Sequence, residues 1–295
     1  MRSNVRLRAG MTLIDTIVAL ALLVVLAGFG ALIVHAEDNV NNRVNCARNL
    51  RMIGQAMLLY SNENRGAYPR TNYDPASADK PEAFTNPKKE APTEDESKDH
   101  VDPAYIKAGP KANDVTAAIF RLLATQDIKH DVFICPSSVD PEQGPPDKPD
   151  PATQVNFSDG RQLSYSYCNP YPNEAAVDAK FILNNSTPAE FALAADLNPG
   201  VDELLTVNAS SGAEEMKKVN TKNHNGEGEN VLFADGHVEF TQNPFVGIER
   251  DNIYTYGKSG PTSGGEGIIG SPANDKDSIL LPTAKQAPAT QPTAK

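Results

Sequence analysis

Tryptophan is absent from this sequence, and aromatic residues make up only 6% of it. A platform of aromatic rings for stacking sugars is therefore not favoured. Basic residues are also scarce, since 27 lysines and arginines face 38 aspartates and glutamates, for a formal net charge of −11. Because phosphate binding needs clustered basic side chains, and no basic stripe is visible, we expect no nucleic acid among the partners.

Cysteine is also scarce and occurs three times, as Cys46, Cys135 and Cys168. No Cys-x-x-Cys pair exists, so a zinc cage of paired cysteines or a thioredoxin-like site is not supported. An exported protein can form a disulfide, and we expect one between Cys135 and Cys168, which both fall in the presumed folded part. Three free buried thiols remain the alternative.

A long apolar run stands out near the N-terminus. A leader with three arginines ends at Gly10, one acid follows at Asp15, and residues 17–34 are uninterrupted apolar residues. As a helix this run is about 27 Å long, close to the hydrocarbon thickness of a bilayer. The arginines precede the run, so we expect the leader in the cytoplasm and everything after residue 34 to be exported.

The sequence Gly-Met-Thr-Leu-Ile-Asp over residues 10–15 resembles the start of type IV prepilins and of the pseudopilins of type II secretion systems. The resemblance implies that a prepilin peptidase cuts between Gly10 and Met11 and methylates the new amine. It also implies that the acid pairs with the amine of a sister pilin or pseudopilin, which explains a carboxylate inside a membrane helix. Asp15 stands where the family usually has glutamate.

Two other interpretations of this segment remain open. Val-His-Ala over residues 34–36 is an acceptable signal-peptidase site before Glu37, so the segment could be an ordinary secretory signal peptide. A plain signal anchor is the other alternative. The apolar run is longer than a usual signal-peptide core, and Asp15 would lie inside it, which favours prepilin-type processing.

After residue 34 the pattern becomes amphipathic without a break. Apolar residues recur at three- and four-residue steps up to Tyr60, and no proline occurs before Pro69. We therefore expect one helix of about 50 residues, with a membrane half at 11–34 and an amphipathic half at 35–65. Gly66 and Pro69 predict where it stops.

A second resemblance concerns two distant segments. Residues 46–69 and the sequence from His224 to Asp235-Gly236 are similar to a prepilin-like family of planctomycete-type bacteria with a C-terminal His-x9-Asp-Gly element. Here ten residues, not nine, separate His224 from Asp235. The implied fold is α+β, with a long N-terminal helix packed on a small antiparallel sheet in a pilin-like arrangement.

The remaining segments are read from composition and pattern. We expect a leader at 1–10, an exposed low-complexity insertion at 66–110, an exported β domain at 111–250 and a mostly disordered tail at 251–295. Within the domain the patterns predict a helix at 115–124, strands at 132–135, 164–168 and 191–195, and a hairpin at 230–240. Asp235-Gly236 predicts a type I′ turn in that hairpin.

Histidine and carboxylate residues gather in the C-terminal part of the domain. Asp196, His224 and His237 are the residue types that bind divalent transition metals, which makes them weak candidates for a cation site. Yet the turn alone explains Asp235, and His224 can simply order the Gly-rich loop. No nucleophile elbow or His-Glu-x-x-His helix is present, so we expect neither an enzyme nor a cofactor.

The function that these observations predict is structural. The chain would be a pseudopilin-like subunit, anchored once in the inner membrane with its N-terminus in the cytoplasm, in a type II secretion or pilus-like assembly. Its partners would be the prepilin peptidase, sister pseudopilins or pilins, and the membrane. The alternative is a membrane-tethered binding module that never polymerises and holds a ligand or cation in its exported domain.

Overall fold

A computed structural model of the chain describes residues 13–88, 109–138, 143–257 and 259–287. The chain forms two compact units, residues 1–41 and residues 42–295. The expected long helix is α1 (Leu13–Glu63), which runs for 51 residues without a break. In the part of the chain that the structure describes, no helix combines the length and the apolar character needed to cross a membrane. The predicted span at 11–34 lies partly outside that part, because only the side chains of 13, 14 and 16–25 are described in it.

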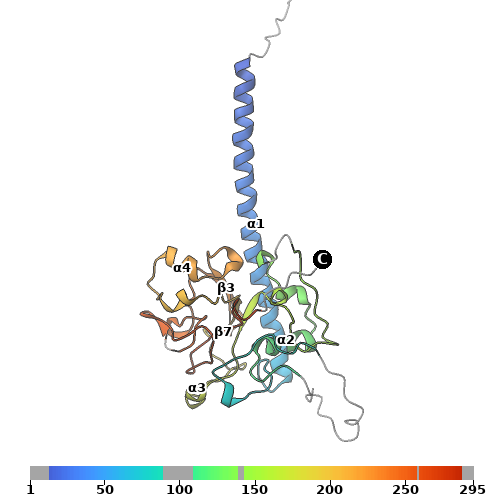
Figure 1. Ribbon diagram of the computed structural model, residues 1–295, viewed down its shortest axis with the longest axis vertical. Helices are drawn as coiled ribbons and strands as arrows, with labels where there is room; N and C mark the ends of the chain where they lie inside the picture. Colours follow the sequence, from blue (N-terminus) through green and yellow to red (C-terminus); the bar gives the residue numbers. More distant parts are fainter. Residues whose placement is uncertain (1–12, 89–108, 139–142, 258, 288–295) are drawn as a thin grey trace, which may run out of the picture. The chain divides into compact units, whose positions relative to one another are not determined.

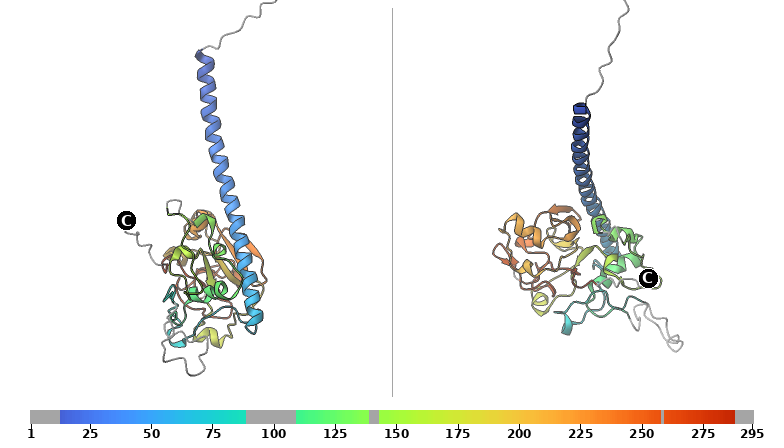
Figure 2. Two further views of the ribbon diagram at one scale, coloured as in Figure 1. Left: turned by 90° about the vertical axis from the view of Figure 1, so that its right-hand side faces the viewer. Right: turned by 45° about the horizontal axis from the view of Figure 1, so that its top comes forward.

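The last turns of α1 belong to the second unit and supply one side of its core. Cys46, Leu50, Ile53 and Met57 are completely buried at steps of four, three and four residues, which is the stripe of an amphipathic helix. Figure 2 shows this part of α1 running along one side of the domain. The helix ends at Glu63, close to the stop that Gly66 and Pro69 predict, and Gly66 has a positive φ of 87°.

The helix packs on a five-stranded antiparallel sheet, which makes the fold α+β as predicted. The strand order is β4-β3-β2-β1-β7, and every residue of β1, β2 and β3 is buried, so these central strands are covered on both faces. Figure 1 shows β3 and β7 inside the domain. The strands are β1 (Tyr165–Cys168), β2 (Ala192–Asp196), β3 (Glu229–Phe233), β4 (Val238–Thr241) and β7 (Leu280–Leu281), beside a separate pair, β5 (Ser259–Gly260) and β6 (Ser263–Gly264).

Short helices connect the strands. The predicted helix at 115–124 is α2 (Val115–Thr125), and Asp114 caps it by accepting a hydrogen bond from the Ala117 amide. The predicted strand at 132–135 is wrong, because these residues form the end of the 3-10 helix η3 (His130–Phe133) and an extended link to Cys135. The other helices are α3 (Glu174–Asp178), α4 (Ala213–Val219), η1 (Pro75–Ser77), η4 (Pro136–Ser138), η5 (Gly160–Gln162), η6 (Asp202–Leu205), η7 (Lys222–His224) and η8 (Ile248–Arg250).

The expected exposed insertion at 66–110 is only partly described, and its first part is integrated into the fold. Tyr68 and Phe84 are buried in the core. The Thr85 amide and hydroxyl both donate to the Asp114 carboxylate, at 2.8 and 2.6 Å. Residues 89–108, which carry the densest run of charge, lie outside the described residues. Residues 66–88 therefore have a fixed structure, although they are rich in proline and acidic residues.

The expectation of a mostly disordered tail at 251–295 is also wrong for most of its length. Ile253 and Tyr254 are completely buried, and β7 adds an edge strand to the sheet by pairing with β1. The Tyr254 hydroxyl donates to the carbonyl of Asp196, 2.8 Å away. Short groups of buried apolar residues and hydrogen bonds attach this Gly- and Pro-rich segment to the domain, although its average composition conceals them.

The hairpin at 230–240 is present, but its turn differs from the expected type. The Gly236 amide donates to the Phe233 carbonyl, so Ala234 and Asp235 are the two central residues of the turn. Asp235 does not have the positive φ that a type I′ turn requires, whereas Gly236 does (φ 87°). This is the longer hairpin loop in which a left-handed glycine follows the turn as a bulge.

Candidate functional site

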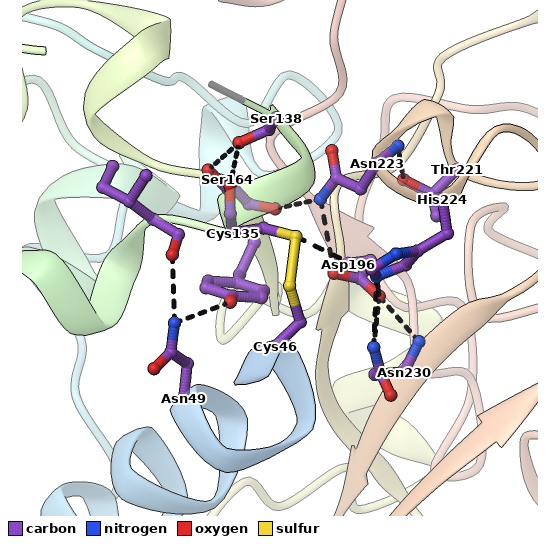
Figure 3. A network of polar contacts seen from close by, with 12 residues as sticks. Cys46, Asn49, Cys135, Ser138, Ser164, Asp196, Thr221, Asn223, His224 and Asn230 are labelled. Atoms are coloured by element: carbon purple, nitrogen blue, oxygen red, sulfur yellow. Dashed lines mark hydrogen bonds and ion pairs between the residues drawn. A yellow bond between two sulfur atoms is a disulfide. The ribbon is translucent and has the colours of Figure 1, made fainter. Parts of the chain in front are cut away.

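In the described part of the chain, a buried cluster of polar and potentially metal-binding side chains surrounds His224 and Asp196 (Figure 3). Asp196 ends β2, and His224 ends η7, whose first residue follows Thr221. The Thr221 hydroxyl accepts from the Asn223 amide, and Asn225 closes the turn with φ 58°. The loop then enters β3, and His224 contacts Asp196 of β2 and Asn230 of β3.

Asp196 is the centre of this cluster and is completely buried. Its Oδ2 accepts from the backbone amide of Asn230 at 2.7 Å and from the side-chain amide of Asn230 at 3.0 Å. Its Oδ1 accepts from the Asn223 side-chain amide at 3.3 Å. Since a buried carboxylate is costly unless it is hydrogen-bonded, these three donors explain why Asp196 is tolerated here.

His224 supplies a fourth contact to the same carboxylate. Its Nε2 lies 3.0 Å from Asp196 Oδ2, and both side chains are completely buried. The Asp196 carboxylate can only accept a hydrogen bond, so we place the ring proton on Nε2, which donates to it. Nε2 is also 3.2 Å from the Asn230 side-chain amide, which itself donates to Asp196 Oδ2. The opposite nitrogen, Nδ1, is buried and has no hydrogen-bond partner among the described residues.

A disulfide borders the cluster. It joins Cys46 of α1 to Cys135, and Cys135 Sγ lies 3.9 Å from His224 Nε2. The expected pair, Cys135 with Cys168, is wrong, because Cys168 on β1 is a free, buried thiol. Burial raises the pKa of the Cys168 thiol well above its usual value. Sequence alone could not choose the partner of Cys135, since the choice depends on where α1 packs.

Glu229 is a second buried acid close to the cluster. Burial raises the pKa of the Glu229 carboxyl well above its usual value, and the negative charge of Asp196 adds to the increase. A backbone contact with Thr221 opposes the shift. Burial therefore favours the protonated, neutral carboxyl of Glu229 over the ionised one.

The other predicted site residues lie elsewhere. His237 and Asp235 are exposed on the hairpin, where they contact each other, and the His237 ring stacks on Phe233 at 4.5 Å. The backbone amide of His237 is the main cause that lowers the pKa of Asp235, and the His237 side chain lowers it further. Of the three weak metal candidates, the structure thus brings Asp196 and His224 together and separates His237 from them.

The residues expected to direct processing cannot be placed. Gly10 and Met11 lie outside the described residues. The backbone of Asp15 is part of α1, but its side chain is not described. Gly236 is placed, as the bulge residue of the hairpin turn.

The cluster joins four segments that are distant in the sequence: α1 with Cys46, the link between η3 and η4 with Cys135, β2 with Asp196, and η7 with His224. Its four metal-binding residue types, Cys46, Cys135, Asp196 and His224, each have one ligand atom within 4.8 Å of the others. Neither cysteine was predicted as part of the site. Asn230 was not predicted either, although it is a polar residue inside the strand β3, directly before the apolar residues 231–233. As it stands, with the sulfurs joined and every side chain buried, the cluster is suited to fixing α1 on the sheet.

Comparison of the chain with protein-family models, with curated proteins and with solved structures found no match in any of the three.

Proposed function

We propose that this protein is a structural, pseudopilin-like subunit of a type II secretion or pilus-like assembly. A prepilin peptidase removes residues 1–10, and the N-terminal helix anchors the mature chain in the inner membrane. The folded domain lies on the periplasmic or exported side, in a pilin-like relation to the helix. Sister pseudopilins or pilins are its partners.

The observation that carries this proposal is the contrast along the single helix α1. All nine large apolar side chains described between Leu13 and Val25 are exposed, with exposed fractions from 52% at Val18 to 78% at Leu13. By contrast, Leu50 and Met57 of the same helix are completely buried in the domain core. A helix that is apolar all round needs lipid or other helices around it. The exposed apolar half of α1 is available for assembly with lipid and sister helices, whereas the buried half forms part of the domain core. A subunit that assembles through its N-terminal helix needs both.

The disulfide supports export of the domain. Cysteine pairs persist in oxidising compartments and are rare in the reducing cytosol. The bond between Cys46 and Cys135 therefore fits a domain that lies outside the cytoplasm. The three arginines of the leader favour the same orientation, since basic residues flank membrane helices on the cytoplasmic side.

Analysis of the mature N-terminus tests the processing step. We expect the membrane form to begin at N-methylated Met11, and Gly10→Leu to leave the leader attached. Ala36→Leu is the matched control, because it blocks a signal-peptidase cut before Glu37 but leaves the prepilin site intact. A mature chain that begins at Glu37, with processing lost in Ala36→Leu, contradicts the proposal.

Crosslinking in membranes tests assembly. If Asp15 pairs with the amine of a neighbouring subunit, Asp15→Ala should abolish the ladder of crosslinked oligomers and Asp15→Glu should preserve it. Asp38→Ala, which removes an acid outside the apolar run, should leave the ladder unchanged. Absence of a ladder in the wild type, with normal processing, would identify a tethered module that does not polymerise.

A further inference from the structure

We propose that Cys46, Cys135, Asp196 and His224 form a buried, four-coordinate zinc site when the disulfide between the two cysteines is reduced. The four ligand atoms, two sulfurs, one carboxylate oxygen and one imidazole nitrogen, lie within 4.8 Å of one another. All four residues are completely buried. This inference does not depend on the proposed function.

The ligand set is one that Zn²⁺ prefers. Zinc binds cysteine sulfur at about 2.3 Å, and histidine nitrogen or aspartate oxygen at about 2.0–2.2 Å, in tetrahedral geometry. Neighbouring ligand atoms of such a tetrahedron are about 3.3–3.8 Å apart. Nε2 of His224 is already 3.9 Å from Cys135 Sγ and 3.0 Å from Asp196 Oδ2. The main movement required is separation of the two sulfurs, which are now covalently joined.

The surroundings of Asp196 resemble the outer shell of a metal site. Side-chain amides of Asn223 and Asn230 and the Asn230 backbone amide fix the orientation of the carboxylate. Such hydrogen bonds to a ligand carboxylate orient it and tune the metal. They also offset part of the excess negative charge, since two thiolates and one carboxylate outweigh the two positive charges of the ion. Four protein ligands leave no open position, so the site would be structural and not catalytic.

The disulfide and the metal exclude each other. A dithiol or phosphine reductant supplies two electrons, the S–S bond breaks, and two protons complete two thiols. Zinc then binds the two sulfurs as thiolates and releases those two protons. His224 stays neutral and binds through Nε2 after its ring proton moves from Nε2 to Nδ1. Reoxidation by a disulfide oxidant rejoins the sulfurs, returns two electrons to the oxidant and expels the ion.

Metal titration of the full-length chain in detergent tests the proposal. The chain is compared in its oxidised form and after anaerobic reduction with a phosphine, using Co²⁺ absorption as the probe and Zn²⁺ as competitor. We expect the reduced chain to bind one ion with thiolate-to-cobalt charge-transfer bands, and the oxidised chain to bind none. Zinc at 100 times its Kd should raise the melting temperature of the reduced chain by about 5–10 °C.

Variants separate metal binding from loss of the disulfide. The double variant Cys46→Ser/Cys135→Ser lacks the bond but also the ligands, so zinc should not raise its melting temperature. Cys168→Ser is the matched control, since its thiol is buried on β1 outside the cluster, and it should bind as the wild type does. Asn223→Ala should weaken zinc binding by about 10–100-fold through loss of a hydrogen bond to Asp196.

Three results would overturn the zinc site. The first is a reduced, folded chain that binds no metal, and the second is equal binding by the double cysteine variant or by the oxidised chain. The third is a reduced chain that unfolds and that zinc does not refold. Each of these leaves the processing and crosslinking tests of the proposed function unaffected, so failure of the zinc site is distinguishable from failure of that function.

Discussion

His224 and His237 carry the same imidazole in opposite environments. His224 is completely buried and donates to the carboxylate of Asp196, whereas His237 is exposed on the hairpin and contacts Asp235. If His224 only ordered the Gly-rich loop, its loss would cost about one loop hydrogen bond, roughly 0.5–1.5 kcal/mol. Because His224 is buried against a carboxylate, we expect its loss to cost more stability than that.

We predict that His224→Ala lowers the free energy of unfolding by about 2–4 kcal/mol, because it removes a charge-assisted hydrogen bond and leaves a cavity. His237→Ala should cost less than about 1 kcal/mol, since exposed pairs contribute little. Denaturant unfolding of both variants in their oxidised forms measures the difference. Equal losses would show that the buried cluster does not stabilise the domain.

Glu229 should make stability depend on pH. Its pKa is raised in the folded state, so the folded chain holds a proton that the unfolded chain releases above the usual glutamate pKa of about 4.3. The contribution is therefore complete below that pH and declines as the pH rises towards the folded-state pKa, by up to about 1.4 kcal/mol per pH unit. Glu229→Gln, which is neutral throughout, should flatten this decline. Glu239→Gln on the exposed strand β4 is the control, and an identical slope in all three proteins would refute the prediction.

At the scale of the element, the hairpin β3–β4 depends on one glycine. Gly236 has φ 87°, and a Cβ there would meet no atom within 4 Å. A side chain at position 236 would therefore be strained by the backbone conformation and not by contact with neighbouring atoms. We predict that Gly236→Val destabilises the domain by about 1–3 kcal/mol, whereas Gly236→Asn, which tolerates a left-handed backbone better, costs clearly less. Thermal or denaturant melts that rank the two variants equally would contradict this origin of the strain.

At the scale of the whole molecule, one covalent bond fixes α1 to the sheet domain. The cysteines are 89 residues apart in sequence, so the disulfide removes much conformational freedom from the unfolded chain. We predict that Cys46→Ser/Cys135→Ser lowers the free energy of unfolding in metal-free buffer by about 4–5 kcal/mol. Cys168→Ser should not reproduce that loss. Peptide mapping without reduction should recover Cys46 linked to Cys135, and recovery of Cys135 linked to Cys168 would overturn the pairing.

The sequence by itself determined the elements whose signals are local. Helical periodicity predicted α1 as one helix, and Gly66 and Pro69 predicted a stop close to its observed end at Glu63. Alternation predicted β1, a short apolar run predicted β2, and Asp235-Gly236 between strand-forming residues predicted the hairpin. The α+β class, which the resemblance of residues 46–69 and 224–236 implied, agrees with these elements. Each of these predictions depends on residues that are close together in the chain, so the local pattern of the sequence is enough to make it.

Only the tertiary structure decided which distant residues meet. Three features depend on how α1, η7 and β7 pack: the partner of Cys135, the burial of His224 beside Asp196, and the fixed structure of residues 66–88, 251–257 and 259–287. Composition suggested disorder in those segments, because a few buried side chains such as Phe84 and Tyr254 barely change an average. The free energy that attaches such segments comes from long-range burial and hydrogen bonds, and chain order does not encode those contacts locally.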